Sequence, residues 1–180
     1  MSREAASAYV LFDRDGTLIE FEHYLIDPSR VELAKGTLQG LHLLKKHGFL
    51  FGMITNQSVI GRGLATSDLV MEVNQRVISL LSAEGIEFQF ALFCPHTPED
   101  FCECRKPAPG LGKIAIQEHN LAPDRSYMIG DQLSDVEFGH AIGCKSIQIS
   151  GKINDERVAD HYAENVLGAA EWIILEMKRG

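Results

Sequence analysis

The stretch at residues 9–17, YVLFDRDGT, joins four apolar residues to a turn that carries two aspartates. A short apolar run bounded by turn residues is typical of a strand that is buried on both faces of a sheet. Asp13 and Asp15 follow this run two positions apart, and Gly16 allows the chain to turn there. The stretch therefore predicts a buried strand whose carboxyl end carries acidic side chains.

The same pattern recurs along the chain. Further apolar runs predict strands at 49–54, 88–93, 126–129 and 146–149. Segments with apolar residues at helical spacing alternate with these runs, at 38–45, 69–81, 111–119, 135–142 and 169–178. Thr66 or Ser67 is expected to cap the second of these helices. The alternation predicts an α/β fold, a doubly wound and mostly parallel sheet with helices on both faces.

Length, charge and hydropathy exclude several classes of protein. A chain of 180 residues is long enough for one domain with a sizeable core, so we expect a single domain over residues 1–180. A formal charge of −8 argues against a nucleic-acid partner. No apolar run approaches the roughly 20 residues that span a bilayer, and the start lacks a signal-peptide pattern. We therefore expect a cytoplasmic protein with no membrane or nucleic-acid partner. No long exposed apolar face or heptad seam stands out in the sequence, so a monomer is expected.

Polar motifs follow four of the expected strands. They lie at 13–17 (DRDGT), 55–58 (TNQS), 94–106 (a cysteine-rich stretch) and 130–135 (GDQLSD). Ligands in open α/β sheets bind beyond the carboxyl ends of the strands. The four motifs are therefore expected to meet at one site.

The acidic residues of these motifs indicate a metal site. Asp13, Asp15 and Asp131 would repel one another if they converged, and Mg²⁺ would offset that repulsion through oxygen ligands. Two aspartates at this spacing, taken alone, are more often a turn with solvated side chains. The magnesium site is favoured because a second acidic cluster, a Thr-Asn pair and Lys106 each follow a separate strand.

The cysteine-rich stretch indicates a second metal. The pattern C-x-H-x5-C-x-C is formed by Cys94, His96, Cys102 and Cys104. Thiolate and imidazole at this spacing predict a closed, structural Zn²⁺ site in the loop 94–104, because cytosolic thiols are kept reduced and do not form a disulfide framework. Such a site would order a loop that has little apolar content. The alternative is four side chains that are merely close, either buried or redox-active.

The remaining cysteine and histidines are not expected to bind metal or take part in catalysis. Cys144 is expected to be a small buried filler of the core. The other six histidines, among them His23, are expected to lie on the surface or to pack against neighbours.

The strings FDRDGTL, TNQS, CRKPAPG and GDQLSD, in this order, resemble the haloacid dehalogenase superfamily. Within it they are similar to the branch that contains histidinol phosphatases and heptose bisphosphate phosphatases. The resemblance covers about residues 9–149 and implies a haloacid dehalogenase-like Rossmannoid fold. A helix and a strand already occupy each interval between the motifs, so no cap domain is expected.

The resemblance implies a mechanism for the first three motifs. Asp13 would attack phosphorus to give an aspartyl-phosphate. Asp15 would protonate the leaving oxygen and then deprotonate the incoming water. Thr55 and Lys106 would hold the equatorial phosphoryl oxygens. The loop 94–104 would present Arg105 and Lys106 toward the phosphate.

The resemblance also implies roles for the remaining motif residues. Asp131 would complete the Mg²⁺ site, and Asp135 would orient Lys106 or a metal-bound water. Further substrate contacts are expected from Arg14, Asn56, Gln57, Ser58, Arg62, Arg105 and Gln132. The zinc loop and the segment 20–24 are expected to wall the pocket.

The substrate is expected to be a small phosphorylated metabolite, and two remain open. Arg62 and Arg105 would receive the remote phosphate of D-glycero-D-manno-heptose 1,7-bisphosphate, from which the 7-phosphate would be removed. Glu20 and Glu22 would suit the cationic histidinol phosphate instead. Gln132 departs from the Lys of some heptose enzymes and weakens the first assignment.

Two further classes remain as alternatives. A non-catalytic module that binds a phosphorylated ligand would retain the fold and the zinc loop, although the intact acids argue against it. A polynucleotide 3′-phosphatase carries related motifs, but the acidic balance disfavours it.

Overall fold

A parallel sheet forms the middle layer of the structure, a computed structural model that describes residues 6–149 and 158–179. Its strands within these ranges are β1 (Tyr9–Phe12), β2 (Leu50–Asn56), β3 (Phe90–Cys94), β4 (Tyr127–Gly130), β5 (Lys145–Ile149) and β6 (His161–Ala163). They lie in the order β3-β2-β1-β4-β5-β6, and every neighbouring pair is parallel. The expected doubly wound α/β fold is confirmed.

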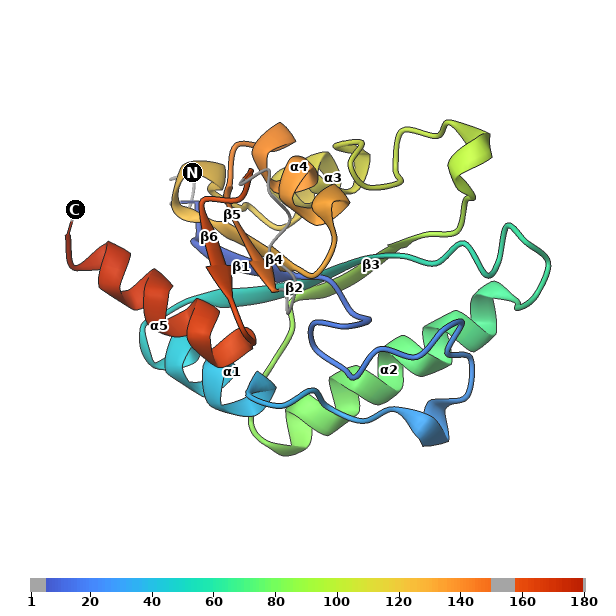
Figure 1. Cartoon of the computed structure of the whole chain (residues 1–180), viewed down its shortest axis with the longest axis horizontal. Helices are drawn as coiled ribbons and strands as arrows, with labels where there is room; N and C mark the ends of the chain where they lie inside the picture. Colours follow the sequence, from blue (N-terminus) through green and yellow to red (C-terminus); the bar gives the residue numbers. More distant parts are fainter. Residues whose placement is uncertain (1–5, 150–157, 180) are drawn as a thin grey trace, which may run out of the picture.

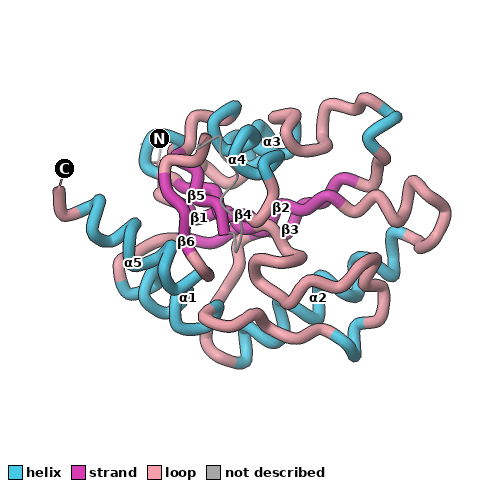
Figure 2. The backbone as a smooth tube through the Cα atoms, viewed as in Figure 1, coloured by secondary structure: helices cyan, strands magenta, loops and turns pink. Residues whose placement is uncertain are grey.

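Helices cover both faces of this sheet. The longer helices of the described ranges are α1 (Thr37–Lys46), α2 (Ser67–Ala83), α3 (Gly110–Glu118), α4 (Leu133–Ala141) and α5 (Val166–Met177). Short 3-10 turns lie at Pro28–Arg30, Pro98–Asp100 and Pro123–Arg125. In Figure 1, α3 and α4 lie above the sheet, while α1, α2 and α5 lie below it. Figure 2 shows the strands as the layer between the two sets of helices.

Alternation of side chains along β1 divides the core into two clusters. Val10 and Phe12 pack with residues of α1, α2 and α5, whereas Tyr9 and Leu11 pack with residues of α3 and α4. Successive side chains of a strand point to opposite faces of a sheet. Because both faces are covered, all four residues are buried, which explains the uninterrupted apolar run in the sequence.

Capping side chains decide where two helices begin. Thr66 accepts a hydrogen bond from the Leu69 amide, so it caps α2 as expected. Asn165 caps α5 through the Gly168 amide, which places the start of that helix three residues before the expected one. Strand β6 was not predicted, because it is short, half-buried and has no apolar run.

The strand order creates a topological switch point between β1 and β4. After β1 the chain continues to β2 on one side, whereas β4 pairs with β1 on the other side. Connections diverge at such a point and leave a crevice at the carboxyl ends of the two strands. Among the described residues, no helix has the length and apolar character to cross a membrane.

Replacement of Phe51 tests the core on the α1 side. Its side chain is 2% exposed and its ring centroid lies 6.1 Å from Phe12 and 5.6 Å from Phe88. Phe51→Ala is expected to lower the free energy of unfolding by about 3 to 5 kcal/mol, measured by denaturant titration, because a cavity remains. Leu175→Ala, at an exposed position of α5, should change it by less than about 0.5 kcal/mol. Equal effects of the two changes would contradict this account of the core.

Candidate active site

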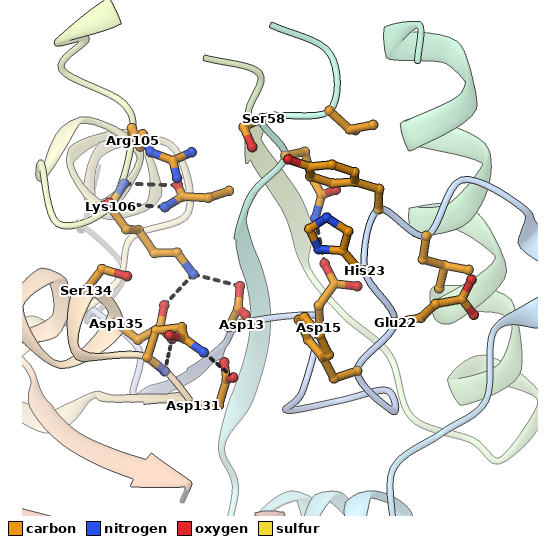
Figure 3. Close-up of a pocket in the computed structure, with 17 residues that line it drawn as sticks. Asp13, Asp15, Glu22, His23, Ser58, Arg105, Lys106, Asp131, Ser134 and Asp135 are labelled. Carbon is orange, nitrogen blue, oxygen red and sulfur yellow. Dashed lines mark hydrogen bonds and ion pairs between the residues drawn. The ribbon is translucent and has the colours of Figure 1, made fainter. Parts of the chain in front are cut away.

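A cavity of about 400 Å³ opens at the switch point. It is lined by Asp13 and Asp15, by residues 21–25 and 56–59, by Arg105 and Lys106, and by residues within 131–135. Figure 3 shows Lys106, Asp13, Asp131 and Asp135 on one side of the cavity, with Glu22 and His23 across from them. Residues from all four predicted motifs therefore lie together.

Two glycines allow the acidic side chains to approach. Gly16 has φ +76°, and a Cβ there would lie 2.8 Å from Asp131 Oδ2. A Cβ on Gly130 would overlap the Asp135 carboxylate. Gly16 thus serves both the turn and the close packing of carboxylates, whereas Gly130, at the end of β4, serves the close packing alone.

Lys106 is the buried cation of the site. Its Nζ donates to Asp13 Oδ1 at 2.7 Å and to the Ile54 carbonyl at 2.7 Å, and lies 2.6 Å from Asp135 Oδ1. Burial opposes the charge, but the carboxylates of Asp13 and Asp135 outweigh it and raise the pKa of Lys106. All three N–H bonds of the ammonium have an acceptor, so a phosphoryl oxygen would have to share one of them.

The backbone of Lys106 is held as firmly as its side chain. Asn56 Oδ1 accepts from the Lys106 amide at 3.0 Å, and Asn56 Nδ2 donates to the Lys106 carbonyl at 3.1 Å. This pair ties the end of β2 to the residue that follows the cysteine-rich loop 94–104 and Arg105. Asn56, predicted to bind substrate, lines the cavity but uses both ends of its amide on Lys106.

The carboxylates that lie closest together are those of Asp13, Asp131 and Asp135, which have oxygens within 4.8 Å of one another. Asp135 uses its oxygens on Lys106 and on the Gln132 amide. Asp131 Oδ1 is buried and has no hydrogen-bond partner among the described residues. Burial, followed by the charge of Asp13, raises the pKa of Asp131 to about 7. This crowding fits a hard divalent cation between Asp13 and Asp131.

Asp15 lies outside that group of carboxylates, contrary to the predicted set of three. Arg14 Nε and Nη2 donate to its two oxygens at 3.2 and 3.0 Å, and Gln57 Nε2 donates to Oδ2 at 2.8 Å. Burial raises the pKa of Asp15 above its usual range, and Arg14 opposes the rise. The Asp15 residue still lines the cavity, where its carboxylate is held by Arg14 and Gln57.

Arg14 and Thr55 do not line the cavity, although both were predicted to contact substrate or phosphate. Arg14 is 1% exposed and directs its guanidinium to Asp15, Gln57 and Asn74. Thr55 is buried, and its Oγ1 accepts from Gln57 Nε2 at 3.0 Å. Gln57 lines the cavity and joins these side chains.

The other predicted substrate residues divide into two groups. Ser58, Arg105 and Gln132 line the cavity, and Arg105 Nη1 also donates to the His96 carbonyl at 3.0 Å. Gln132 Nε2 donates to Asp131 Oδ2. Arg62 is exposed and is not among the cavity-lining residues, so it does not stand ready for a remote phosphate.

An aromatic wall was only partly predicted. The segment 20–24 was expected to form a wall, and residues 21–25 do so, but His23 had been assigned to the surface or to packing. Its ring centroid lies 3.8 Å from that of Tyr24. No local pattern separates His23 from the other histidines, because its place depends on how the segment folds over the sheet.

The four zinc-type ligands form a cluster beside the cavity. Their donor atoms lie within 4.8 Å of one another, with separations of 3.2 Å from Cys104 Sγ to Cys94 Sγ and 3.5 Å from Cys94 Sγ to His96 Nδ1. A tetrahedron with metal–sulfur bonds of about 2.3 Å has edges of about 3.8 Å. The cluster thus fits Zn²⁺. All four cysteines of the chain are free thiols, and Cys144 is buried as expected.

Comparisons with known proteins identify the family. A family model described as "HAD-hyrolase-like" matches residues 103–169. The chain is 32% identical over 143 residues to the D-glycero-beta-D-manno-heptose-1,7-bisphosphate 7-phosphatase of Pasteurella multocida, a match covering 76% of this chain and 78% of that protein. The chain belongs to the haloacid dehalogenase superfamily. Its place within the phosphatase branch that the motifs indicated is confirmed.

Two further comparisons also agree with the chain's place in this superfamily. It is 37% identical over 153 residues to the histidine biosynthesis bifunctional protein HisB of Legionella pneumophila, covering 83% of this chain and 44% of that protein. The chain therefore spans less than half the length of this bifunctional relative. The D,D-heptose 1.7-bisphosphate phosphatase of B. bronchiseptica has the same fold, with a TM-score of 0.80 over 94% of this chain and 99% of that one at 23% identity.

The close approach of Asp135 to Gly130 in this haloacid dehalogenase-like site gives a testable prediction. Gly130→Ala is expected to lower the free energy of unfolding by about 2 to 3 kcal/mol, because the new methyl group must displace the buried Asp135–Lys106 pair. Gly168→Ala, in the first turn of α5, is the matched control. Its Cβ would make only ordinary contacts, so its unfolding free energy should stay equal or rise. A tolerated Gly130→Ala would contradict the geometry described for Asp135.

Proposed function

We propose that the chain is a Mg²⁺-dependent phosphatase that acts on a small phosphorylated metabolite through an aspartyl-phosphate. The observation that carries this proposal is the buried Lys106 ammonium between Asp13 and Asp135, next to the unpartnered oxygen of Asp131. This arrangement holds the Asp13 carboxylate in place beside the cavity. It also leaves an anionic position for a divalent cation beside that carboxylate.

In the first step, an oxygen of Asp13 forms a bond to phosphorus while the bond between phosphorus and the ester oxygen breaks. The ester oxygen takes a proton from the Asp15 carboxyl group, and the alcohol leaves. The raised pKa of Asp15 supports this role, because it favours the protonated form from which an acid must act. Lys106 holds the Asp13 carboxylate in line during attack.

In the second step, water attacks the phosphorus of the aspartyl-phosphate. Asp15, now ionised, takes a proton from that water, and the bond from phosphorus to Asp13 breaks. Inorganic phosphate leaves, and both aspartates return to their first state. The sum of the two steps is hydrolysis of a phosphate ester to an alcohol and phosphate.

Asp13 and Asp131 are the residues that would hold Mg²⁺. When bound, the ion supplies positive charge that lets an anionic phosphate approach a carboxylate. Asp135 orients the Lys106 ammonium and would not bind the ion, since both Asp135 oxygens already bind Lys106 and the Gln132 amide. The B. bronchiseptica structure with the same fold is described as complexed with magnesium and phosphate, which supports this choice of ion.

The first candidate substrate is D-glycero-D-manno-heptose 1,7-bisphosphate, with removal of the 7-phosphate. What supports it is the match across most of both chains to proteins named for that activity. Arg105, at the rim of the cavity, is available for the second phosphate. Arg62 lies outside the cavity lining, so it does not add to this support.

The second candidate is histidinol phosphate. The bifunctional histidine-biosynthesis proteins match at 37% identity. The cavity also carries the rings of His23 and Tyr24, which suit a cationic substrate with a planar ring. Glu22 lines the cavity as well, although its carboxylate pairs with Arg30 at 2.9 Å. For either substrate we place the reaction in the cytoplasm and in a monomer. The cysteines are free thiols, as is usual for proteins of a reducing compartment.

A substrate comparison tests the proposed reaction. Purified protein with Mg²⁺ is expected to release phosphate from the heptose bisphosphate with a kcat/KM at least about tenfold above that for histidinol phosphate. Asp13→Asn should lower both rates by at least about 1000-fold, because it removes the attacking oxygen anion. A preference for histidinol phosphate would select the second candidate. Unchanged turnover by Asp13→Asn would refute the covalent mechanism, and no turnover of any ester would favour a non-catalytic binding module.

We also propose that the cluster of Cys94, His96, Cys102 and Cys104 holds structural Zn²⁺. The separations of the four donor atoms support it. The ion would supply four bonds that fix the loop and carry Arg105 and Lys106 on its trailing end. Asn56 then joins that end to β2.

Loss of one ligand tests the zinc proposal. Cys104→Ser is expected to reduce zinc content, measured by elemental analysis, from one ion per chain to well below one. Its Tm should fall by roughly 5 to 10 °C, because the loop loses its main source of order. Cys144→Ser is the matched control, since Cys144 is buried but lies outside the cluster. It should keep one zinc ion per chain. Full zinc content in Cys104→Ser would overturn the assignment of ligands.

A further inference from the structure

A buried network of side chains lies behind Asp15, away from the metal position. At its centre is Arg14, whose Nε and Nη2 bond the two oxygens of Asp15 as a fork. Arg14 Nη2 also donates to Gln57 Oε1 at 3.0 Å, and Gln57 Nε2 donates to Asp15 Oδ2. The remaining guanidinium nitrogen, Nη1, donates to Asn74 Oδ1 at 2.8 Å.

Asn74 is an unexpected residue at its position. It lies on the buried face of α2 with Val70, Val73 and Val77, and it is 5% exposed. A buried amide is costly unless it is hydrogen-bonded, and Asn is a weak helix former. Its bond to Arg14 spans sixty positions of sequence and joins α2 to the turn after β1. Asn74 does not line the cavity, so any effect on a reaction passes through Arg14.

The geometry of the fork depends on this bond. Arg14 is enclosed, so every guanidinium nitrogen needs an acceptor within the protein. Without Asn74 Oδ1, Nη1 would be a buried donor with no acceptor from α2, and the guanidinium would turn to find another. Rotation of the planar group would break the two parallel bonds to Asp15. The position of the Asp15 carboxylate thus depends on a helix residue that never meets the ligand.

We propose that Asn74 is a positioning residue for the general acid, which fixes Arg14 so that Arg14 fixes Asp15. The proposal rests on the proposed function, in which Asp15 gives a proton to the leaving oxygen. It adds a residue of α2 that none of the four motifs contains. It also explains why the arginine between the two aspartates of DRDGT is buried and not directed into the cavity.

The test compares two esters that differ in their need for a proton. An alkyl phosphate, namely the better of the two candidate substrates, requires protonation of its leaving oxygen. 4-Nitrophenyl phosphate does not, because nitrophenolate leaves as the anion. For Asn74→Leu, kcat/KM is expected to fall about 30-fold or more for the alkyl ester, a large part of the roughly 100- to 10,000-fold that a general acid contributes. The fall should be less than about threefold for the aryl ester, since kcat/KM reports the first displacement.

Two variants sharpen the comparison. Asn74→Asp keeps an oxygen at the place that accepts from Arg14, so it should restore most of the alkyl-ester activity. Val77→Ala, on the same buried face of α2, is the matched control. It is expected to lower stability while leaving the ratio of the two kcat/KM values within about twofold of wild type. Thermal unfolding of each variant verifies that the assays are made on folded protein.

The outcomes separate the inference from the function on which it rests. Equal loss on both esters in folded Asn74→Leu, or the same split in Val77→Ala, would overturn the positioning role. Wild-type protein that hydrolyses neither ester would refute the proposed function itself. If Asn74→Leu does not fold, the double change Arg14→Met with Asn74→Leu removes both partners of the buried pair. The double variant should show the same larger loss on the alkyl ester than on the aryl ester. Equal losses on the two esters in this variant would also overturn the inference.

Discussion

The structure of this site depends on one buried charge, the ammonium of Lys106. A buried cation is tolerated only when acceptors surround it, and here two carboxylates and one carbonyl do so at 2.6 to 2.7 Å. The two carboxylates exceed the single positive charge that they share. Asp131 is a third carboxyl group close to both, and burial together with the charge of Asp13 raises its pKa to about 7. The site therefore carries an excess of negative charge at the side of Asp13 and Asp131, which a divalent cation would offset.

The need to surround the Lys106 ammonium with acceptors fixes several segments at once, because each of its partners comes from a different part of the chain. Asp13 follows β1, Ile54 lies within β2 and Asp135 lies in the first turn of α4. Asn56 fixes the Lys106 backbone, and the cluster of cysteines and histidine lies just before it in sequence. A parallel sheet with a switch point at β1 and β4 brings these segments to one edge. The cavity is consequently built on rigid elements, although most of its lining belongs to loops.

The fold and the location of the site could be predicted from the sequence because both follow from local patterns. Apolar runs marked β1 to β5, and polar motifs marked their carboxyl ends. The orientation of individual side chains could not be predicted in this way. Arg14 was expected to meet substrate, yet it turns away from the cavity to reach Asn74 on α2. Asp135, not Asp15, joins Asp13 and Asp131, because Arg14 and Gln57 hold the Asp15 carboxylate apart.

By itself, the sequence determined the alternation of strands and helices, the family and the residue types that gather at the strand ends. These properties are encoded in spacing along one segment, where the period of a strand or helix decides which residues share a face. Only the tertiary structure decided which of those residues face the ligand. It brought His23 to the cavity wall, left Arg62 outside the lining and made α2 a support for Asp15. The physical reason is that the direction of a polar side chain depends on its nearest buried partner, and that partner lies far away in sequence.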